Sequence, residues 1–164
     1  MSALARWFHA QGAEVAGYDR NTTSLTQALQ KEGIAVDHSG ASTALPQSLQ
    51  EDIATGNTAR WTIVWTPAIP MEFPLLKLLR KSGFALQKRS EILGKLSENK
   101  PVLAVAGTHG KTTTSYMLTH IMLDQGNDIG FLVGGISNNI SGSASLGSHK
   151  TFVIEADEYD SAFF

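Results

Sequence analysis

The sequence predicts an α/β fold built on parallel sheets, and three observations support this class. Short apolar runs alternate with amphipathic segments of helical period, which is the order expected of a doubly wound sheet. The apolar strand expected at residues 102–106 leads directly into a glycine-rich loop and a helix. The composition is that of an ordinary globular protein, because 42% of the 164 residues are hydrophobic and 17% are charged.

The composition also argues against several other classes of protein. The formal net charge is -2 and the basic residues are scattered, so we predict no nucleic-acid partner. No apolar run approaches the roughly 20 residues that span a bilayer, and no signal peptide is visible, so we predict no membrane partner. The absence of cysteine excludes disulfides and thiolate metal sites and agrees with a cytoplasmic location. The sequence carries no information on the oligomeric state.

Helices and strands alternate from the first residues of the chain. Leu4, Trp7 and Phe8 recur at helical spacing, so we expect a helix over residues 2–11, ended by Gly12. The elements expected next are a strand at 14–18, a helix at 23–31, a loop with one weak helix at 40–58, a strand buried on both faces at 61–65, a helix at 73–81, a strand at 84–86 and a helix at 90–98 with Ser90 as its N-cap.

The polar, proline-containing segment 98–101 predicts a domain boundary. The elements expected beyond it are a buried strand at 102–106, a helix from 111 to about 125, and strands at 129–133 and 151–154. The apolar residues expected on one face of that helix are Met117, Leu118, Ile121 and Met122. We therefore predict a Rossmann-like parallel sheet domain over residues 1–98, followed over residues 99–164 by the start of a P-loop ATPase-like parallel sheet domain.

Both ends of the chain are unusual for a complete protein. A doubly wound sheet normally begins with a strand and a glycine turn ahead of its first helix, whereas this chain opens on the helix. Phe163 and Phe164 are aromatic residues that a solvated terminus would rarely expose. The sequence therefore predicts a chain truncated at both ends.

The strongest functional motif is a glycine loop between a strand and a helix, and its residues are Gly107, Thr108, His109, Gly110, Lys111, Thr112 and Thr113. Glycines let consecutive backbone N–H groups turn toward one anion, and the helix N-terminus adds unpaired N–H groups with a partial positive charge. Lys111 can reach the β- and γ-phosphates of ATP, and the Thr112 hydroxyl can ligate Mg²⁺.

The loop departs from the common G-x-x-x-x-G-K-[ST] pattern, because Val105 stands where that pattern has its first glycine. The alternative interpretation is a coincidental glycine turn. The strand before the loop and the helix after it favour a phosphate-binding loop. His109 alone carries little information, because a loop histidine is usually just solvated.

An acidic cluster follows the strand expected at 151–154. The side chains that act on ligands in open α/β sheets emerge at the carboxyl ends of strands, and Mg²⁺ prefers anionic oxygen ligands. Glu155 is the first choice for a magnesium ligand and Asp157 the second. The alternative is an ordinary charged loop after a core strand.

Three further segments are weaker candidates for substrate binding. Two glycines and two asparagines after the strand at 129–133 offer close backbone approach and amide groups, which ordinary turn chemistry also explains. An aspartate follows the strand at 14–18, at the point where dinucleotide folds place a ribose-binding acid. The third segment is the loop after the strand at 61–65. The candidates are Gly135 and Asn138 in the first segment, Asp19 in the second, and Thr66 and Ala68 in the third.

The loop Gly107–Thr113 resembles the ATP loop of the Mur ligases, the family that builds the peptidoglycan precursor, and the resemblance runs the length of the chain. The other matching segments, in family order, are Gly17–Asp19, Thr66–Ile69, Arg89–Glu91, Gly134–Gly135 and Glu155–Glu158. The histidine form of the loop resembles two branches, one adding L-alanine to UDP-N-acetylmuramate and one recycling the murein tripeptide. Arg89–Gly94 resembles the first branch and Tyr159–Phe164 the second, and we favour alanine addition.

The resemblance implies a three-domain ligase with a UDP-binding domain, a central ATPase domain and a C-terminal amino-acid-binding domain. The chain would contain most of the first domain without its first strand and glycine loop, and the front of the second, and would be inactive alone. The implied reaction joins L-alanine to UDP-N-acetylmuramate through an acyl phosphate, with ATP and Mg²⁺. The resemblance implies catalytic roles for Lys111 and Glu155, and metal ligation by Thr112 and Glu155.

The alternatives are the recycling ligase, a ligase of the folate-polyglutamating type, and a non-catalytic nucleotide-binding module. The histidine form of the loop and the Rossmann-like half before it argue against the folate type.

Overall fold

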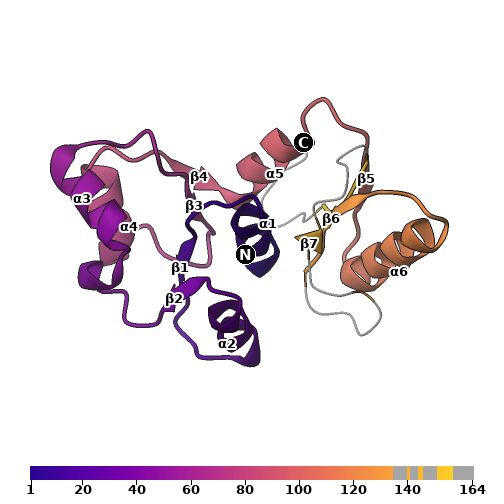
Figure 1. The fold of residues 1–164 in the computed structure, drawn as a ribbon, viewed down its shortest axis with the longest axis horizontal. Helices are drawn as coiled ribbons and strands as arrows, with labels where there is room; N and C mark the ends of the chain where they lie inside the picture. The colour runs from indigo at the N-terminus through magenta and orange to yellow at the C-terminus, as the bar shows by residue number, and fades with distance from the viewer. Residues whose placement is uncertain (135–139, 141–143, 146–150, 157–164) are drawn as a thin grey trace. The chain divides into compact units, whose positions relative to one another are not determined.

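The structure is a computed structural model that describes residues 1–134, 140, 144–145 and 151–156 (Figure 1). The chain divides into two compact units, one of Met1–Val15 with Leu93–Phe164 and one of Ala16–Ile92. Its elements in order are α1 (Ser2–Ala10), β1 (Ala16–Tyr18), α2 (Ser24–Lys31), β2 (Ala35–Asp37), the 3-10 helix η1 (Ser42–Ala44), α3 (Gln47–Thr55), β3 (Ile63–Trp65), α4 (Pro74–Lys81), β4 (Leu86–Lys88), α5 (Arg89–Ser97), β5 (Val102–Val105), α6 (Lys111–Asp124), β6 (Gly130–Leu132), β7 (Ala144–Ser145) and β8 (Phe152–Glu155).

The unit Ala16–Ile92 contains two separate parallel strand pairs, β1 with β2 and β3 with β4. Helices α3 and α4 pack on the second pair through a core that includes Leu49, Leu79 and Phe84. Tyr18, the last residue of β1, packs against Phe73 with ring centroids 4.7 Å apart. Parallel pairing of strands joined through helices confirms the predicted α/β class.

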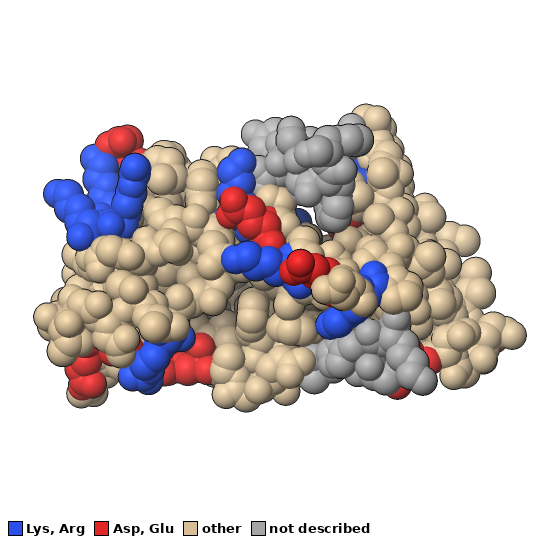
Figure 2. All heavy atoms as spheres, turned by 90° about the horizontal axis from the view of Figure 1, so that it is seen from above, with Lys and Arg blue, Asp and Glu red and all other residues tan. Residues whose placement is uncertain are grey.

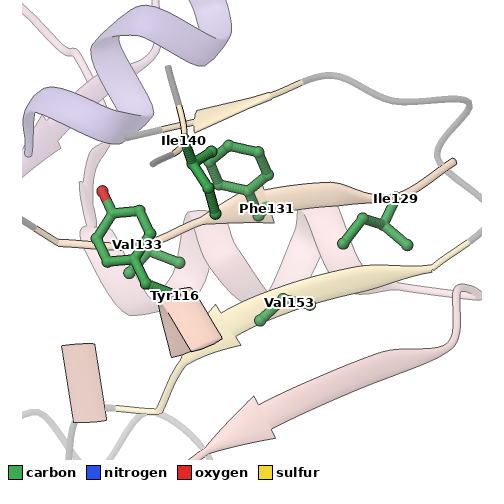
Figure 3. Close-up of a cluster of buried hydrophobic side chains, with 6 residues drawn as sticks. All are labelled: Tyr116, Ile129, Phe131, Val133, Ile140 and Val153. Atoms are coloured by element: carbon green, nitrogen blue, oxygen red, sulfur yellow. The ribbon is translucent and has the colours of Figure 1, made fainter. Parts of the chain in front are cut away.

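The unit that contains residues 93–156 holds a four-stranded sheet in the order β5-β8-β6-β7. Strands β5, β8 and β6 are parallel, and the short β7 runs antiparallel to β6. Because side chains alternate along β8, its two faces enter two different cores. The core facing α6 contains Tyr116, Ile129, Phe131, Val133, Ile140 and Val153 (Figure 3).

The opposite face of this sheet packs against α1 and α5. Ala3 and Trp7 of α1 and Leu93 of α5 contact Phe152 and other residues of the sheet. Figure 1 shows α6 on one side of these strands and α1 with α5 on the other, so the unit has three layers. The compact units assign α1 and the part of α5 from Leu93 onward to the sheet of β5, β6 and β8. The predicted division into domains 1–98 and 99–164 stays a prediction.

Several local predictions were wrong in instructive ways. Strands β2 and β7 have three and two residues and were not predicted, since runs so short show no periodicity. Strand β3 is half-buried rather than buried on both faces. Helix α5 begins at Arg89, so Ser90 lies inside its first turn and is not the N-cap. The Glu91 carboxylate accepts a hydrogen bond from the Lys88 backbone N–H at 2.6 Å, next to the helix start.

The predicted apolar face of α6 was also wrong in part. Leu118 and Met122 pack against the core, but Met117 and Ile121 are 61% and 57% exposed. The face that meets the sheet is completed by the buried residues Ser115, Tyr116 and Thr119. The Thr119 hydroxyl donates to the Ser115 carbonyl oxygen at 2.7 Å, so a residue that is polar in the sequence can be buried.

Strand β5 is an edge strand of the described sheet, and its Leu103 is 38% exposed. The prediction of a buried strand was therefore wrong, because an apolar run does not specify which neighbours cover it. Within the described part of the chain, no helix has the length and apolar character needed to cross a membrane.

Candidate nucleotide-binding site

The loop between β5 and α6 combines two glycines in conformations that other residues rarely adopt. Gly107 has a φ of 146° and Gly110 a φ of 78°. Gly110 is the N-cap of α6 in the left-handed region, and no side chain of the described residues caps this helix start. A left-handed residue followed by helical ones turns successive N–H groups toward one point. The first N–H groups of α6 also have no acceptor within the helix.

Lys111 is the first residue of α6, and its ammonium group folds back over the loop. Its Nζ donates a hydrogen bond to the Gly107 carbonyl oxygen, and the side chain is partly buried. The neighbouring side chains of Thr108, His109, Thr112 and Thr113 are exposed. The loop therefore presents backbone N–H groups, one ammonium group and several hydroxyls around a single point, which is a donor set suited to phosphate oxygens.

Glu155 ends β8, directly beside the strand that feeds the loop. Val105 is its partner in the parallel ladder, and the Ala156 N–H donates to the Val105 carbonyl oxygen at 3.0 Å. Because both strands run in the same direction, the carboxylate and the loop leave the sheet at the same edge. The order of the strands thus places the loop that contains Lys111 and the end of β8 that carries Glu155 at one edge of the sheet, although these residues are far apart in the sequence.

The carboxylate of Glu155 is held against the main chain that follows β6. A Cβ atom built on Gly134 would lie 3.0 Å from Glu155 Oε2. Glu155 Oε1 is buried and has no hydrogen-bond partner among the residues that the structure describes. A buried, unpartnered carboxylate oxygen is costly unless a cation or donor binds it.

Tyr116, one turn into α6, adds to the environment of this carboxylate. Its ring lies in the core in Figure 3, and burial raises the pKa of Tyr116. The negative charge of Glu155 raises that pKa further, whereas Arg6 of α1 acts in the opposite direction. Because side chains alternate along β8, Glu155 lies on the same face as Val153, which packs in the core that faces α6.

Comparisons with known proteins identify the family. The model of the Mur ligase family, catalytic domain, matches residues 1–101. The UDP-N-acetylmuramate–L-alanine ligase of Christiangramia forsetii is 42% identical over 163 residues, which is 99% of this chain and 35% of that protein. The enzyme of the same name from Porphyromonas gingivalis is 40% identical over 164 residues, again 99% of this chain and 35% of that protein. The chain belongs to the Mur ligase family.

Solved structures of Mur ligases have the same fold. The UDP-N-acetylmuramate:L-alanyl-gamma-D-glutamyl-meso-diaminopimelate ligase of Neisseria meningitides has a TM-score of 0.78 and 29% identity, and the match covers 100% of this chain and 51% of that one. The UDP-N-acetylmuramate–alanine ligase of Thermotoga maritima has a TM-score of 0.77 at 23% identity over 94% of this chain and 34% of that one, which shows the fold alone. The chain spans about a third of the length of the curated relatives it matches.

The residues present fit a magnesium ion at this Mur ligase loop. In the described residues no group of three or more His, Cys, Asp or Glu side chains could hold a metal on its own. Mg²⁺ bound with a nucleotide needs only one or two protein ligands, because the phosphates and water complete its octahedron. The unpartnered Oε1 of Glu155 and the exposed Thr112 side chain near the start of α6 are suited to that role.

The substrate candidates of the sequence analysis lie in ordinary turns. Asp19 follows β1, and its Oδ1 accepts from the Asn21 N–H at 2.9 Å. Thr66 follows β3, and its hydroxyl oxygen accepts from the Ala68 N–H at 3.1 Å. Both turns stand at the carboxyl ends of strands, so their assignment to substrate binding stays a prediction. Gly135, Asn138 and Asp157 lie outside the described residues.

Charged side chains are distributed in small groups on the face drawn in Figure 2. Lys and Arg lie in several separate places there, and most of these groups stand beside Asp or Glu. The sequence analysis placed Gly134 in a candidate segment for substrate binding, but it did not predict the approach of Gly134 to the Glu155 carboxylate. It missed Tyr116, because nothing in the sequence pointed to that residue.

Proposed function

We propose that the chain binds ATP and Mg²⁺ at the loop between β5 and α6, and that it forms part of a ligase that joins L-alanine to UDP-N-acetylmuramate. The observation that carries the proposal is the pairing of β5 with β8, which brings the Lys111 loop and the Glu155 carboxylate to one edge of the sheet. Its place in the Mur ligase family and the names of its curated relatives support the choice of reaction.

The proposed chemistry converts a poor acyl donor into a good one. A carboxylate resists attack by an amine because its leaving group would be an oxide. Transfer of the γ-phosphoryl group of ATP to the muramoyl carboxylate gives an acyl phosphate and ADP. The amino group of L-alanine then attacks the carbonyl carbon, the C–O bond to phosphate breaks, and the ammonium proton is lost to a base. The products are an amide and inorganic phosphate.

The residues of the loop would position the phosphates and neutralise their charge. Lys111 would exchange its hydrogen bond to Gly107 for the β- and γ-phosphate oxygens, and the N–H groups at the start of α6 would bind the same oxygens. Glu155 and Thr112 would hold Mg²⁺. When bound, Mg²⁺ supplies charge neutralisation to the phosphoryl group during transfer.

The unit that contains β1 to β4 would bind the UDP-linked substrate. In this unit Asp19, Thr66 and Ala68 follow β1 and β3 at their carboxyl ends. Gly135 and Asn138 belong to the segment after β6 and are proposed separately as substrate contacts, from the glycines and amides of that segment. We propose residues 1–98 as this substrate domain and residues 99–164 as the start of the ATP domain. The proposed location is the cytoplasm, where ATP is supplied.

Recycling of the murein tripeptide is the second candidate reaction. Two murein peptide ligases of known structure share 29% identity with the chain and have TM-scores of 0.76 and 0.78. Alanine addition remains the preferred proposal, because the curated relatives near 40% identity carry that name.

The test is an assay of the protein expressed from its complete reading frame. With ATP, Mg²⁺ and UDP-N-acetylmuramate present, phosphate release is measured with L-alanine or with L-alanyl-γ-D-glutamyl-meso-diaminopimelate as the amine. Release with L-alanine supports the proposal, and release with the tripeptide alone supports recycling. No release with either amine would contradict both. A separate reaction with a folate in place of UDP-N-acetylmuramate tests the folate type, and release in that reaction alone would indicate it.

A further inference from the structure

We propose that Gly134 is a positioning residue for the metal-binding carboxylate, because the absence of a side chain there gives Glu155 the room to turn one oxygen toward Mg²⁺. This inference rests on the proposed function, in which Glu155 holds Mg²⁺. Gly134 itself touches neither nucleotide nor metal in this account and acts through Glu155.

The contact geometry at Gly134 involves the carboxyl group of Glu155. A Cβ atom on Gly134 would lie 3.0 Å from Oε2, 3.8 Å from Cδ and 3.9 Å from Oε1, and these are its nearest heavy atoms in the described structure apart from its chain neighbours. A separation of 3.0 Å between a carbon and an oxygen atom is tight, so the carboxyl group would have to give way by a few tenths of an ångström. The whole carboxyl group therefore faces the α-carbon of Gly134.

The backbone conformation does not explain the glycine. Gly134 is absent from the glycines with positive φ, which include Gly107 and Gly110. The φ of Gly134 is therefore not one that requires glycine, and among the described residues the Glu155 carboxyl group is what an added Cβ would meet. This separates Gly134 from the loop glycines, whose conformations themselves favour glycine.

The strands on both sides limit how the structure could adapt to a methyl group. Leu132 of β6 pairs with Ile154 of β8, and Val105 of β5 pairs with Glu155 itself. The ladder with β5 fixes the backbone of position 155, and position 134 follows the last residue of β6 by two residues. The end of the Glu155 side chain is the most flexible part of the contact, so the carboxyl group would move first. Its Oε1 is already buried and unpartnered, and any rotation would turn that oxygen away from its present direction.

The expected effect is a loss of magnesium affinity with little change in nucleotide affinity. Residues that orient a metal ligand typically contribute 10–100-fold to metal affinity. We therefore expect Gly134→Ala to reduce by about 10-fold or more the factor by which Mg²⁺ tightens binding of β,γ-imido-ATP. Binding of the same analogue in EDTA should change by less than about twofold, since the Lys111 loop is untouched.

The experiment compares four proteins expressed from the complete reading frame: wild type, Gly134→Ala, Glu155→Gln and the double variant. The equilibrium dissociation constant of β,γ-imido-ATP is measured by calorimetry with Mg²⁺ and with EDTA. Gly94→Ala is the matched control, because Gly94 is exposed in α5 and a Cβ there meets no described atom within 4 Å. It should leave both constants unchanged.

The double variant separates positioning from general packing. If Gly134 acts through the carboxylate, Gly134→Ala should lower the magnesium affinity of the otherwise wild-type protein. In the Glu155→Gln background the same substitution should cause no further loss of magnesium affinity. An equal cost in both backgrounds, or no cost in the wild type, would overturn the inference. If Glu155→Gln itself leaves the magnesium effect intact, the metal role in the proposed function fails, which is a distinct result.

Folding is controlled by thermal unfolding without nucleotide. Should Gly134→Ala fail to fold, Glu155→Asp is added, because it withdraws the carboxyl group by one methylene. Recovery of folding and of part of the magnesium effect would support the proposed contact. A double variant that stays unfolded would show that the conflict is not with the carboxylate and would overturn the inference.

Discussion

Replacing Lys111 by alanine removes the ammonium group that lies over the loop between β5 and α6, where Nζ donates to the Gly107 carbonyl oxygen. In the proposed function the same group neutralises the β- and γ-phosphate oxygens during phosphoryl transfer. Two unit charges about 4 Å apart interact by about 4 kcal/mol at an effective dielectric constant of about 20. Since about 1.4 kcal/mol corresponds to a factor of ten in rate, the upper bound is about 10³-fold.

We expect Lys111→Ala to lower turnover by about 10²–10³-fold, which is the loss measured for single preorganised charge contacts in other enzymes. Turnover is measured as phosphate release with saturating ATP, UDP-N-acetylmuramate and L-alanine. Lys100→Ala is the control, because Lys100 precedes the opposite end of β5 and its Nζ lies 5.1 Å from the centroid of the Phe152 ring. A loss of less than about threefold for Lys111→Ala would refute the role of this residue.

Three further predictions concern the loop and the stability of the fold. Gly110→Ala forces a φ of 78° on an alanine, so we expect a cost of about 1–2 kcal/mol in unfolding free energy and weaker binding of β,γ-imido-ATP, measured by urea unfolding and calorimetry. Burial alone would raise the pKa of Asp37, but hydrogen bonds, chiefly from Ser39, outweigh it and lower that pKa below 3.8. The stability from Asp37 is then present above pH 3.8 and is lost as the pH falls through the lowered value. Asp37→Asn should therefore lower the unfolding free energy at pH 7 and have no effect at a pH below the lowered pKa. An equal effect at these two pH values would contradict the prediction. Asp52→Ala removes the acceptor of the Trp61 indole N–H at 2.7 Å, so we expect about 1.5–3 kcal/mol of destabilisation by urea unfolding. A change below about 0.5 kcal/mol would show that the contact contributes little.

The phosphate loop could be predicted from the sequence because its signal is local. The strand, the glycines and the start of α6 at Lys111 follow one another directly, and each residue type has its own physical reason at that place. The helices α2 and α4 were predicted within one residue for a similar reason, since Thr23 caps the first and Pro74 opens the second.

The features that depend on strand order could not be predicted. The approach of Gly134 to Glu155 requires β8 to lie between β5 and β6, and no periodicity in the sequence encodes that order. The buried face of α6 was mispredicted because the Thr119 hydroxyl satisfies its hydrogen bond inside the helix, at the Ser115 carbonyl oxygen. The exposure of Met117 and Ile121 likewise depends on which neighbours pack on α6.

The most direct test of the central claim is a crystal structure of the protein with β,γ-imido-ATP and Mn²⁺ in place of Mg²⁺. The account predicts triphosphate density enclosed by residues 107–113, with an anomalous peak for the metal within about 2.2 Å of a Glu155 carboxylate oxygen. A triphosphate bound elsewhere, with this loop empty and the metal distant from Glu155, would contradict it.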